Sequence, residues 1–518
     1  MSSSLIQSAE PSRVGELDLD GQTAVILNRW PAVGLAIGVV GNGSLTSFSA
    51  HGVADIATRS AITEDTVFRI ASISKTFTAV AVLQLWERGA VDLDAPANDY
   101  LRAYRLEPVD ASWRPATLRH LLTHTAGIPE VVPARGAFRR DFGESVELGA
   151  SLPSLAEHYQ GRLPLVAEPG TRFRYGNHGF ATLGQIVEDV SGEPLARYFS
   201  KHIFEPLGME HSDLVRSDRV TARLATGYEM GRTGPKTVAP REFVTAGAAS
   251  VYSTPSDMAR YLAALLDGGS NEHGAVLRSA TVADMFSPQY RPDPRIPGIG
   301  LAFWRVDLGG HGAVEHQGTL PGFHSQVFLA PDDGVAVMAF TNGSWRPDFW
   351  MPFEVSSLLK RVVGVPDDVI RNDVPRRPDT WGELCGWYAL EDPLSDVRMR
   401  GMFGAGAEVF VRGGQLMIRT LTPIPILAKG FPLHPDDPED PLVFRLDLSA
   451  FGFGSMRVVF GCDDGGVSRV HLEVMPLTLV KRPARNVRRW ATAGLVAGAA
   501  GVSVMWARRR RVGARCGG

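Results

Sequence analysis

Ser72-Ile73-Ser74-Lys75 places a hydroxyl and an amine three residues apart. On a helix, residues with this spacing share a face, so we expect Lys75 beside Ser72, one turn later. A serine hydroxyl becomes a good nucleophile when a neighbouring base removes its proton, and a lysine in apolar surroundings can act as that base. A position at the start of a helix adds free N–H groups that can hold an oxyanion. The motif predicts nucleophilic catalysis by Ser72.

Two further motifs strengthen this prediction. SxxK alone is weak evidence, because Ser357-Leu358-Leu359-Lys360 also fits it and is interpreted as an ordinary helix surface. Tyr175-Gly176-Asn177 is the only YxN in the sequence, and His316-Gln317-Gly318 is the only HxG. A tyrosine, a lysine and a serine can pass a proton from the nucleophile to a leaving group. We therefore predict that Ser72, Lys75 and Tyr175 are catalytic.

The remaining site predictions concern supporting groups. His316 is expected on a strand beside the site, where it could orient the substrate or stabilise the tyrosine. The backbone N–H of Thr319, just after Gly318, could complete an oxyanion hole with that of Ser72. His124 and His178 are assigned to structure rather than to chemistry.

Each motif also has a purely structural interpretation. Ser72 could cap a helix that carries a partly buried Lys75, and Asn177 could be the N-cap of the helix after Tyr175. A strand histidine such as His316 is often only packed. The occurrence of all three motifs in one chain favours an active site.

The elements that must position these residues form an α+β pattern. A hairpin is expected at Leu35–Val40 and Leu45–Ser49, and a helix from Ser72 to Arg88 with one buried face. Further helices are expected near Leu118–His124, His178–Val190, Leu195–Phe204, Met258–Leu266 and Pro352–Val363, and strands at Leu301–Val306, Ala313–His316, His324–Leu329 and Val335–Phe340. This order predicts an antiparallel sheet flanked by helices, with a helical subdomain.

The chain divides into five predicted parts. Residues 1–20 are an N-terminal extension, residues 21–363 the catalytic domain, and residues 364–380 a proline-containing linker. Residues 381–482 consist of short strands between Gly- and Asp-containing turns, which predicts a small all-β barrel or sandwich. Residues 483–518 form a basic tail.

Bulk composition restricts the classes of function. The 518 residues include 44% hydrophobic and 21% charged residues, which is typical of a globular protein, and the net charge of −3 argues against a large nucleic-acid surface. The cysteines Cys385, Cys462 and Cys516 lack the spacing of a zinc site, so no metal is expected. A disulfide between Cys385 and Cys462 is compatible with the sequence but not required. No organic cofactor is expected.

The tail has two interpretations. Residues Trp490–Ala507 carry no charge and lie between arginines, so as a helix they would span about 27 Å, close to the hydrocarbon core of a membrane. Their Ala- and Gly-rich composition fits a disordered tail equally well. The N-terminus lacks the pattern of a secretory signal, so we expect a cytoplasmic catalytic domain, with membrane association through the tail left open. The sequence does not predict an oligomeric state.

The three motifs, in this order, resemble those of the β-lactamase-related serine hydrolases: class C β-lactamases, penicillin-binding proteins, D-aminopeptidases and related esterases. The resemblance covers about residues 20–363. Other stretches similar to the family are Leu121–Gly127, Glu168–Gly170, Phe204–Met209 and Tyr252–Pro255. The resemblance implies an acyl-serine mechanism on a small ester, D-amino-acid amide or peptide, without metal or cofactor. It also implies that Lys75 and Tyr175 act as general base and acid, and that Asn177 hydrogen-bonds the substrate or Lys75.

One departure from the family pattern concerns the substrate. Where classical β-lactamases carry the Lys of KTG, which helps to bind the substrate carboxylate, this chain has His316. Efficient β-lactam hydrolysis is therefore less expected than esterase or D-aminopeptidase activity, since HxG is similar to the motif of those relatives. The alternative is a non-catalytic binding or assembly protein of the same fold, tethered to a membrane.

Overall fold

The computed structural model describes residues 17–133, 136, 139, 141–366, 369–391, 406–420, 428–449, 454–473 and 475–483. The predicted helix at 490–507 lies outside these residues. Among the residues described, no helix is both long and apolar enough to cross a membrane. The described chain also contains no cluster of three or more His, Cys, Asp or Glu side chains that could hold a metal ion.

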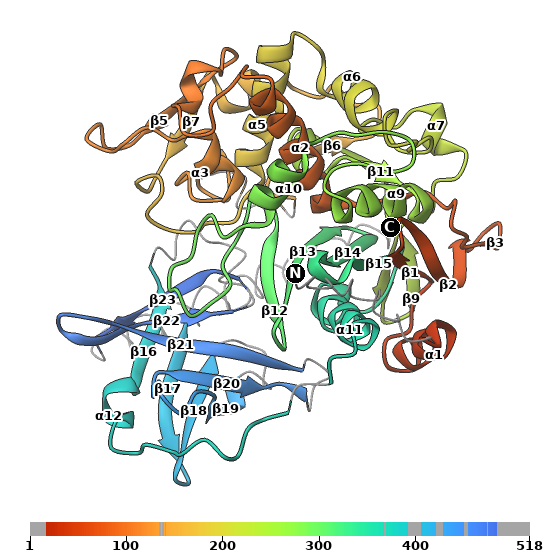
Figure 1. The fold of residues 1–518 in the computed structure, drawn as a ribbon. Helices are drawn as coiled ribbons and strands as arrows, with labels where there is room; N and C mark the ends of the chain where they lie inside the picture. Colours follow the sequence, from red (N-terminus) through yellow and green to blue (C-terminus); the bar gives the residue numbers. More distant parts are fainter. Residues whose placement is uncertain are drawn as a thin grey trace, which may run out of the picture.

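The catalytic part is built on a seven-stranded antiparallel sheet (Figure 1). Its strands, in spatial order, are β12 (Trp304–Leu308), β13 (His311–Leu320), β14 (Phe323–Ala330), β15 (Val335–Thr341), β1 (Gly34–Gly41), β2 (Ser44–Asp55) and β3 (Ser60–Ala61). The predicted hairpin is β1–β2, and the register pairs Leu35 of β1 with Thr341 of β15. β1 is buried along its whole length because both of its faces are covered.

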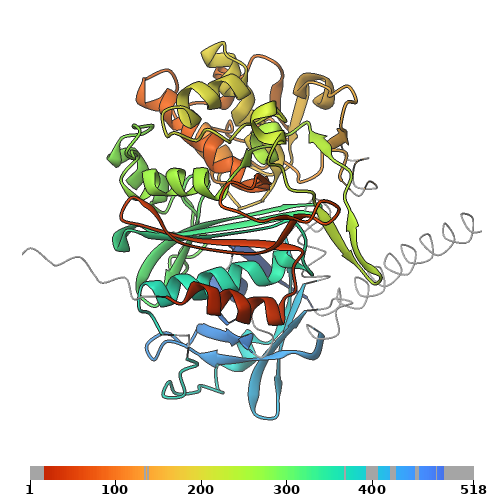
Figure 2. The same cartoon turned by 90° about the vertical axis from the view of Figure 1, so that its right-hand side faces the viewer.

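One face of the sheet is covered by α1 (Leu19–Arg29) and α11 (Pro347–Val362). Figure 2 shows these two helices side by side beneath the sheet. Trp30 at the end of α1 stacks on Trp350 of α11, with ring centroids 6.3 Å apart. Glu354 of α11 accepts hydrogen bonds from Arg29 at 2.9 Å and from the indole N–H of Trp30 at 3.0 Å. These contacts bring the two ends of the catalytic part together.

A helical layer covers the other face. Its helices are α2 (Ser74–Glu87), α3 (Leu118–Leu122), α4 (Leu155–Tyr159), α5 (Asn177–Ser191), α6 (Leu195–Phe199) with a π-turn at Ser200–Phe204, α7 (Asp218–Thr221), α8 (Ala246–Ala249), α9 (Pro255–Leu266) and α10 (Ser279–Phe286). Short two-stranded ladders connect them: β4 (Phe68–Arg69) with β11 (Tyr252–Ser253), β5 (Arg105–Pro108) with β7 (Arg162–Leu165), β6 (Ser145–Glu147) with β10 (Arg241–Phe243), and β8 (Tyr228–Gly231) with β9 (Gly234–Thr237).

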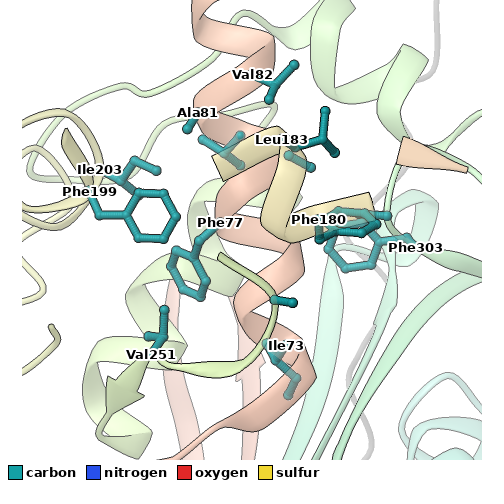
Figure 3. Close-up of a cluster of buried hydrophobic side chains, with 14 of the residues drawn as sticks. Ile73, Phe77, Ala81, Val82, Phe180, Leu183, Phe199, Ile203, Val251 and Phe303 are labelled. Atoms are coloured by element: carbon teal, nitrogen blue, oxygen red, sulfur yellow. The ribbon is translucent and has the colours of Figure 1, made fainter. Parts of the chain in front are cut away.

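Helix α2 lies at the centre of this layer. The face predicted to be buried is buried, and burial extends to every residue from Ser74 to Leu85. Figure 3 shows Phe77 of α2 among aromatic and aliphatic side chains from the surrounding segments, including Phe199 and Val251. The threonines of the helix donate to nearby carbonyl groups: Thr76 to that of Ile73 at 2.8 Å and Thr78 to that of Gly247 at 2.6 Å. The helix that follows Ser72 is thereby held on all sides.

The C-terminal part is a closed eight-stranded antiparallel barrel, which decides between the predicted barrel and sandwich. It follows a short helix α12 (Trp381–Leu384), and its strands are β16 (Gly386–Leu390), β17 (Ala407–Arg412), β18 (Gln415–Thr420), β19 (Phe431–Pro435), β20 (Val443–Asp447), β21 (Ser455–Asp463), β22 (Gly466–Leu472) and β23 (Leu477–Arg482). The barrel has a hydrophobic core of its own. Cys385 and Cys462 are free thiols, so the disulfide that the sequence left open does not form.

The barrel packs on the segment that leads into β12. Arg295 binds the carboxylate of Asp293 through two hydrogen bonds of 2.8 and 2.7 Å. The same guanidinium reaches the barrel, where it donates to Asp440 and to the carbonyl of Phe460, both at 2.8 Å. Planar guanidinium groups suit such multiple contacts, so Arg295 fixes the barrel relative to the catalytic part.

Candidate active site

The chain turns sharply just before Ser72. β4 ends at Arg69, and Ala71 has a φ of +51°, a region that residues with a side chain rarely occupy. Ser72 lies in a short 3₁₀ turn, Ala71–Ile73, and the regular helix begins at Ser74 rather than at the predicted Ser72. Ser72 therefore lies just before the first residue of α2.

Gly318 of β13 supports this turn directly. A Cβ atom at Gly318 would lie 2.2 Å from the carbonyl oxygen of Ile70, 2.2 Å from Oγ of Ser325 and 3.1 Å from Cβ of Ala71. The third position of the HxG motif therefore requires glycine, because β13 passes directly against the backbone that carries Ser72. Thr319 follows at the end of the strand, is exposed, and pairs with His324 of β14.

Lys75 is fully buried, with no exposed surface, and its ammonium nitrogen faces Ser72. Nζ lies 2.9 Å from Oγ of Ser72, 2.9 Å from Oδ1 of Asn177 and 3.0 Å from the carbonyl oxygen of Ala248. The two carbonyl oxygens can only accept hydrogen bonds. In the neutral amine they engage both N–H groups, and the lone pair is then directed toward the Ser72 hydroxyl.

The ring of Tyr175 lies close to the Lys75 amine. Its ring centroid is 5.0 Å from Nζ of Lys75, and the ring of His124 packs against it with centroids 4.6 Å apart. His124 is buried, and the pKa of its imidazole is lowered well below its usual value, first by burial and then by the neighbouring charge of Lys75. His124 thus packs behind Tyr175 as a neutral group, in agreement with the structural assignment from the sequence.

His316 is also buried and neutral. Burial, followed by the neighbouring charge of Lys75, lowers the pKa of His316 to about 3. Its Nδ1 lies 2.8 Å from the carbonyl oxygen of Gln317, so Nδ1 carries the hydrogen and Nε2 can accept one. The indole of Trp304 packs against the imidazole at 4.7 Å and against Tyr175 at 5.6 Å. The three side chains form one aromatic wall.

Asn177 connects Lys75 to a buried carboxylate. Gly176 is the N-cap of α5 and Asn177 is its first residue, so the interpretation of Asn177 as N-cap is wrong. Its side chain instead presents Oδ1 to Lys75 and donates from Nδ2 to Oε2 of Glu144 at 2.6 Å. Glu144 is 2% exposed.

The barrel contributes to the rim of the site. Met475, in the connection from β22 to β23, packs against a cluster of Phe173, Ile299 and Trp304 that also includes Tyr175. Met475 packs at the same time against the core of the barrel. The barrel therefore contacts the aromatic wall directly.

The sequence of the part that holds this site matches a known protein family. The β-lactamase family model matches residues 25–349, which is more than half of the chain. The chain belongs to the β-lactamase family. The matched range includes all the residues predicted for the site, from Ser72 to Thr319.

Relatives within the β-lactamase family include enzymes with different names. The esterase EstB of Burkholderia gladioli is 29% identical over 356 residues, covering 61% of this chain and 87% of the esterase. A D-aminopeptidase of Brucella ovis is 26% identical over 412 residues, covering 77% of this chain and 73% of that protein. The solved structure of an octameric penicillin-binding protein homologue from Pyrococcus abyssi has a TM-score of 0.57 at 24% identity and covers 90% of this chain and 100% of that one. This last likeness shows the fold alone.

Three groups of this β-lactamase-family site were not identified from the sequence. Glu144 and the carbonyl of Ala248 contact the Asn177–Lys75 pair, and Trp304 packs on His316. No local spacing connects Glu144 or Trp304 with the three motifs, because the contacts form only in the folded chain. Ala248 lies shortly before Tyr252–Pro255, a stretch that resembles the family, and this was the one signal available.

Proposed function

We propose that the protein is a serine hydrolase that cleaves small esters or amides, D-amino-acid amides among them, through an acyl-serine intermediate. The observation that carries this proposal is the buried Lys75 amine, 2.9 Å from the hydroxyl of Ser72 and oriented by two acceptor oxygens. This arrangement supports proton removal from the nucleophile, which an ordinary surface lysine could not perform.

The reaction has two halves. In the first, Oγ of Ser72 bonds to the carbonyl carbon of the substrate while its proton passes to Lys75. Tyr175 relays a proton to the departing alcohol or amine, and the bond to the leaving group breaks. In the second half, water attacks the acyl-serine and loses one proton to Lys75, the bond between the acyl carbon and Oγ of Ser72 breaks, and that proton passes to Oγ as the acid leaves. The N–H groups of Ser72 and Thr319 hold the oxyanion in both halves.

The aromatic wall of Tyr175, Trp304 and His316 supports the proposed substrate class. A neutral His316 offers a hydrogen bond but no positive charge to a substrate carboxylate. The packed rings of Trp304 and Tyr175 add apolar surface beside it. An uncharged ester or amide fits this wall better than a β-lactam carboxylate does. The names of the esterase and D-aminopeptidase relatives support the same two substrate classes.

The test is hydrolysis of p-nitrophenyl butyrate by the full chain. We expect Ser72→Ala to lower the rate by more than a thousandfold, because no other group replaces the nucleophile. Ser357→Ala is the matched control, since Ser357 belongs to the second SxxK sequence, on α11, away from the site. It should retain the wild-type rate.

Other outcomes point elsewhere. Equal activity in the wild type and in Ser72→Ala would contradict the assignment of Ser72. If the wild type hydrolyses neither this ester nor D-alanine p-nitroanilide, the hydrolase proposal fails. A labelled β-lactam bound at Ser72 without turnover would then identify the non-catalytic binding protein that the sequence left as the alternative.

A further inference from the structure

Glu144 is a buried carboxylate that the proposed mechanism does not yet use. It lies directly before β6, and its carbonyl accepts the N–H of Val244 at 2.9 Å, which fixes its backbone. Its Oε2 accepts from Nδ2 of Asn177 at 2.6 Å and from the hydroxyl of Thr245 at 3.4 Å. A short hydrogen bond from a buried amide to a carboxylate is one of the stronger kinds.

The contact determines which way the amide of Asn177 points. The oxygen and nitrogen of an asparagine amide are alike in size, so packing alone fixes their orientation poorly. A carboxylate can only accept, and it therefore selects the NH₂ group of Asn177. The carbonyl of the amide must then face Lys75, as the 2.9 Å distance between Oδ1 and Nζ shows.

The reverse orientation would disable the base. With its NH₂ group toward Lys75, Asn177 would donate to the lone pair of the neutral amine. That lone pair is the one that must accept the proton of Ser72, which lies 2.9 Å from the same nitrogen. The orientation of a single amide thus separates a competent general base from a blocked one.

We propose that Glu144 is a positioning residue that holds the carbonyl of Asn177 toward Lys75 and so keeps the lysine lone pair available to Ser72. The proposal rests on the proposed serine-hydrolase function. Glu144 acts through Asn177 and does not itself contact the reacting atoms.

Other titratable groups lie near the contacts that join Glu144, Asn177 and Lys75. Tyr175, His124 and His316 surround Lys75, while His178 brings its Nε2 within 3.9 Å of Oε1 of Glu144 and its Nδ1 within 2.9 Å of the Tyr159 hydroxyl. The lowered pKa values of His124 and His316 keep both neutral at neutral pH. A change in the pH profile of the Glu144 variant is therefore not due to these two histidines.

The test measures the rate at which a fluorophosphonate labels Ser72, as a function of pH, in the full chain. Glu144→Gln replaces a pure acceptor by an amide that can also donate, so Asn177 loses its fixed orientation. We expect labelling to slow by roughly 10- to 100-fold. We also expect the acidic limb of the profile to move down by about one pH unit, because a negative charge near Lys75 is removed.

A double-variant cycle separates positioning from general damage. In the Asn177→Ala background, Glu144→Gln should produce no further slowing, because the residue through which Glu144 acts is gone. Glu354→Gln is the matched control: Glu354 is also buried and hydrogen-bonded, but it lies on α11 beyond the sheet. Its labelling rate and pH profile should equal those of the wild type.

The outcomes are distinct. Wild-type labelling by Glu144→Gln, or equal further slowing in the Asn177→Ala background, overturns the role of Glu144 and leaves the hydrolase proposal standing. Failure of the wild type to be labelled at Ser72 removes both. Circular dichroism checks folding, and if Glu144→Gln does not fold, Glu144→Asp, which withdraws the acceptor by one methylene, takes its place in the same cycle.

Discussion

At the scale of single residues, the site depends on how little space separates β13 from the turn that carries Ser72. Gly318 lies where a Cβ would meet the carbonyl of Ile70 and the hydroxyl of Ser325. The hydroxyl of Ser325 donates to the carbonyl of Ile70 at 2.7 Å. Because this hydrogen bond holds both oxygens in place, neither can move away easily from an added Cβ. The positive φ of Ala71 is thus stabilised from outside the turn.

We expect Gly318→Ala to displace this turn. Overpacking of this kind costs about 1–3 kcal/mol of unfolding free energy, and a displaced nucleophile should lower kcat/KM by at least a hundredfold. Gly312→Ala is the control, because Gly312 lies on the same strand with open space around its would-be Cβ. Urea unfolding and ester hydrolysis measure the two effects. Equal behaviour of the two variants would contradict this account of Gly318.

The residues predicted from the sequence share one property: their spacing is local. Ser72 and Lys75 are one turn apart, and Tyr175 with Asn177 and His316 with Gly318 are short motifs within single segments. Glu144 comes from a different segment, and its contact with Asn177 depends on the pairing of β6 with β10. No pattern along the chain encodes such a contact, so it could be found only in the folded structure.

At the scale of elements, the strands next to the site contain a carboxyl group held in its neutral form. Glu315 of β13 is buried, and burial raises the pKa of its carboxyl to about 8. Its partner is Gln326 of β14, whose Nε2 donates to Oε2 of Glu315 at 2.7 Å. In the unfolded chain the same carboxyl has a pKa of about 4.3.

The stability of the sheet should therefore depend on pH through Glu315. Between about pH 4.3 and 8 the folded state keeps a proton that the unfolded state has released, so the unfolding free energy falls as the pH rises. Between pH 5 and 7 the loss is on the order of 2 kcal/mol, and Glu315→Gln should abolish it. Urea unfolding of both proteins at the two pH values measures the difference.

Other groups do not disturb this comparison. His316 and His324, whose pKa values burial lowers to about 3, reduce stability in the opposite direction as the pH falls below about 6.5. Both histidines are present in the wild type and in Glu315→Gln, so their contributions cancel in the difference between the two proteins. An identical pH dependence in wild type and variant would show that Glu315 is ionised in the folded protein.

Elements were predicted well where periodicity was strong and less well where tertiary packing dominated. The helix predicted near Met258–Leu266 is α9, which begins at Pro255, where Thr254 accepts the N–H of Asp257 at 3.1 Å. Helix α2 was expected to have one buried face. Its neighbours on all sides bury its threonines as well, a fact that the helix's own sequence does not carry.

At the scale of the whole molecule, the barrel and the catalytic part meet beside the aromatic wall. Met475 is the barrel side chain in contact with the cluster of Phe173, Ile299 and Trp304. Methionine is flexible and fills irregular gaps, so it suits the contact between the barrel and this cluster. The sequence predicted a small barrel or sandwich but could not position it, because the docking contacts involve scattered residues such as Arg295.

We expect Met475→Ala to widen the range of accepted esters. Removing this side chain should raise kcat/KM for p-nitrophenyl octanoate relative to the butyrate by roughly tenfold, since pocket contacts of this size carry about 1–3 kcal/mol. Met456→Ala is the control, because Met456 packs against the barrel core but not against the aromatic wall. If the ratio of kcat/KM for the octanoate to that for the butyrate is unchanged in Met475→Ala, the barrel does not select substrates through Met475.

The pairing of β1 with β15 also affects how the protein is made. The register pairs Leu35 with Thr341, about 300 positions further along the chain, and the hydroxyl of Thr341 donates to the carbonyl of Gly34 at 2.7 Å. A ribosome adds about 5–20 residues per second, so β1 emerges roughly 15–60 s before its partner exists. During synthesis, one edge of this wholly apolar strand therefore stays unpaired until β15 is made. An unpaired edge can pair with another chain, so we expect chaperones or the growing helical layer to protect β1 from aggregation.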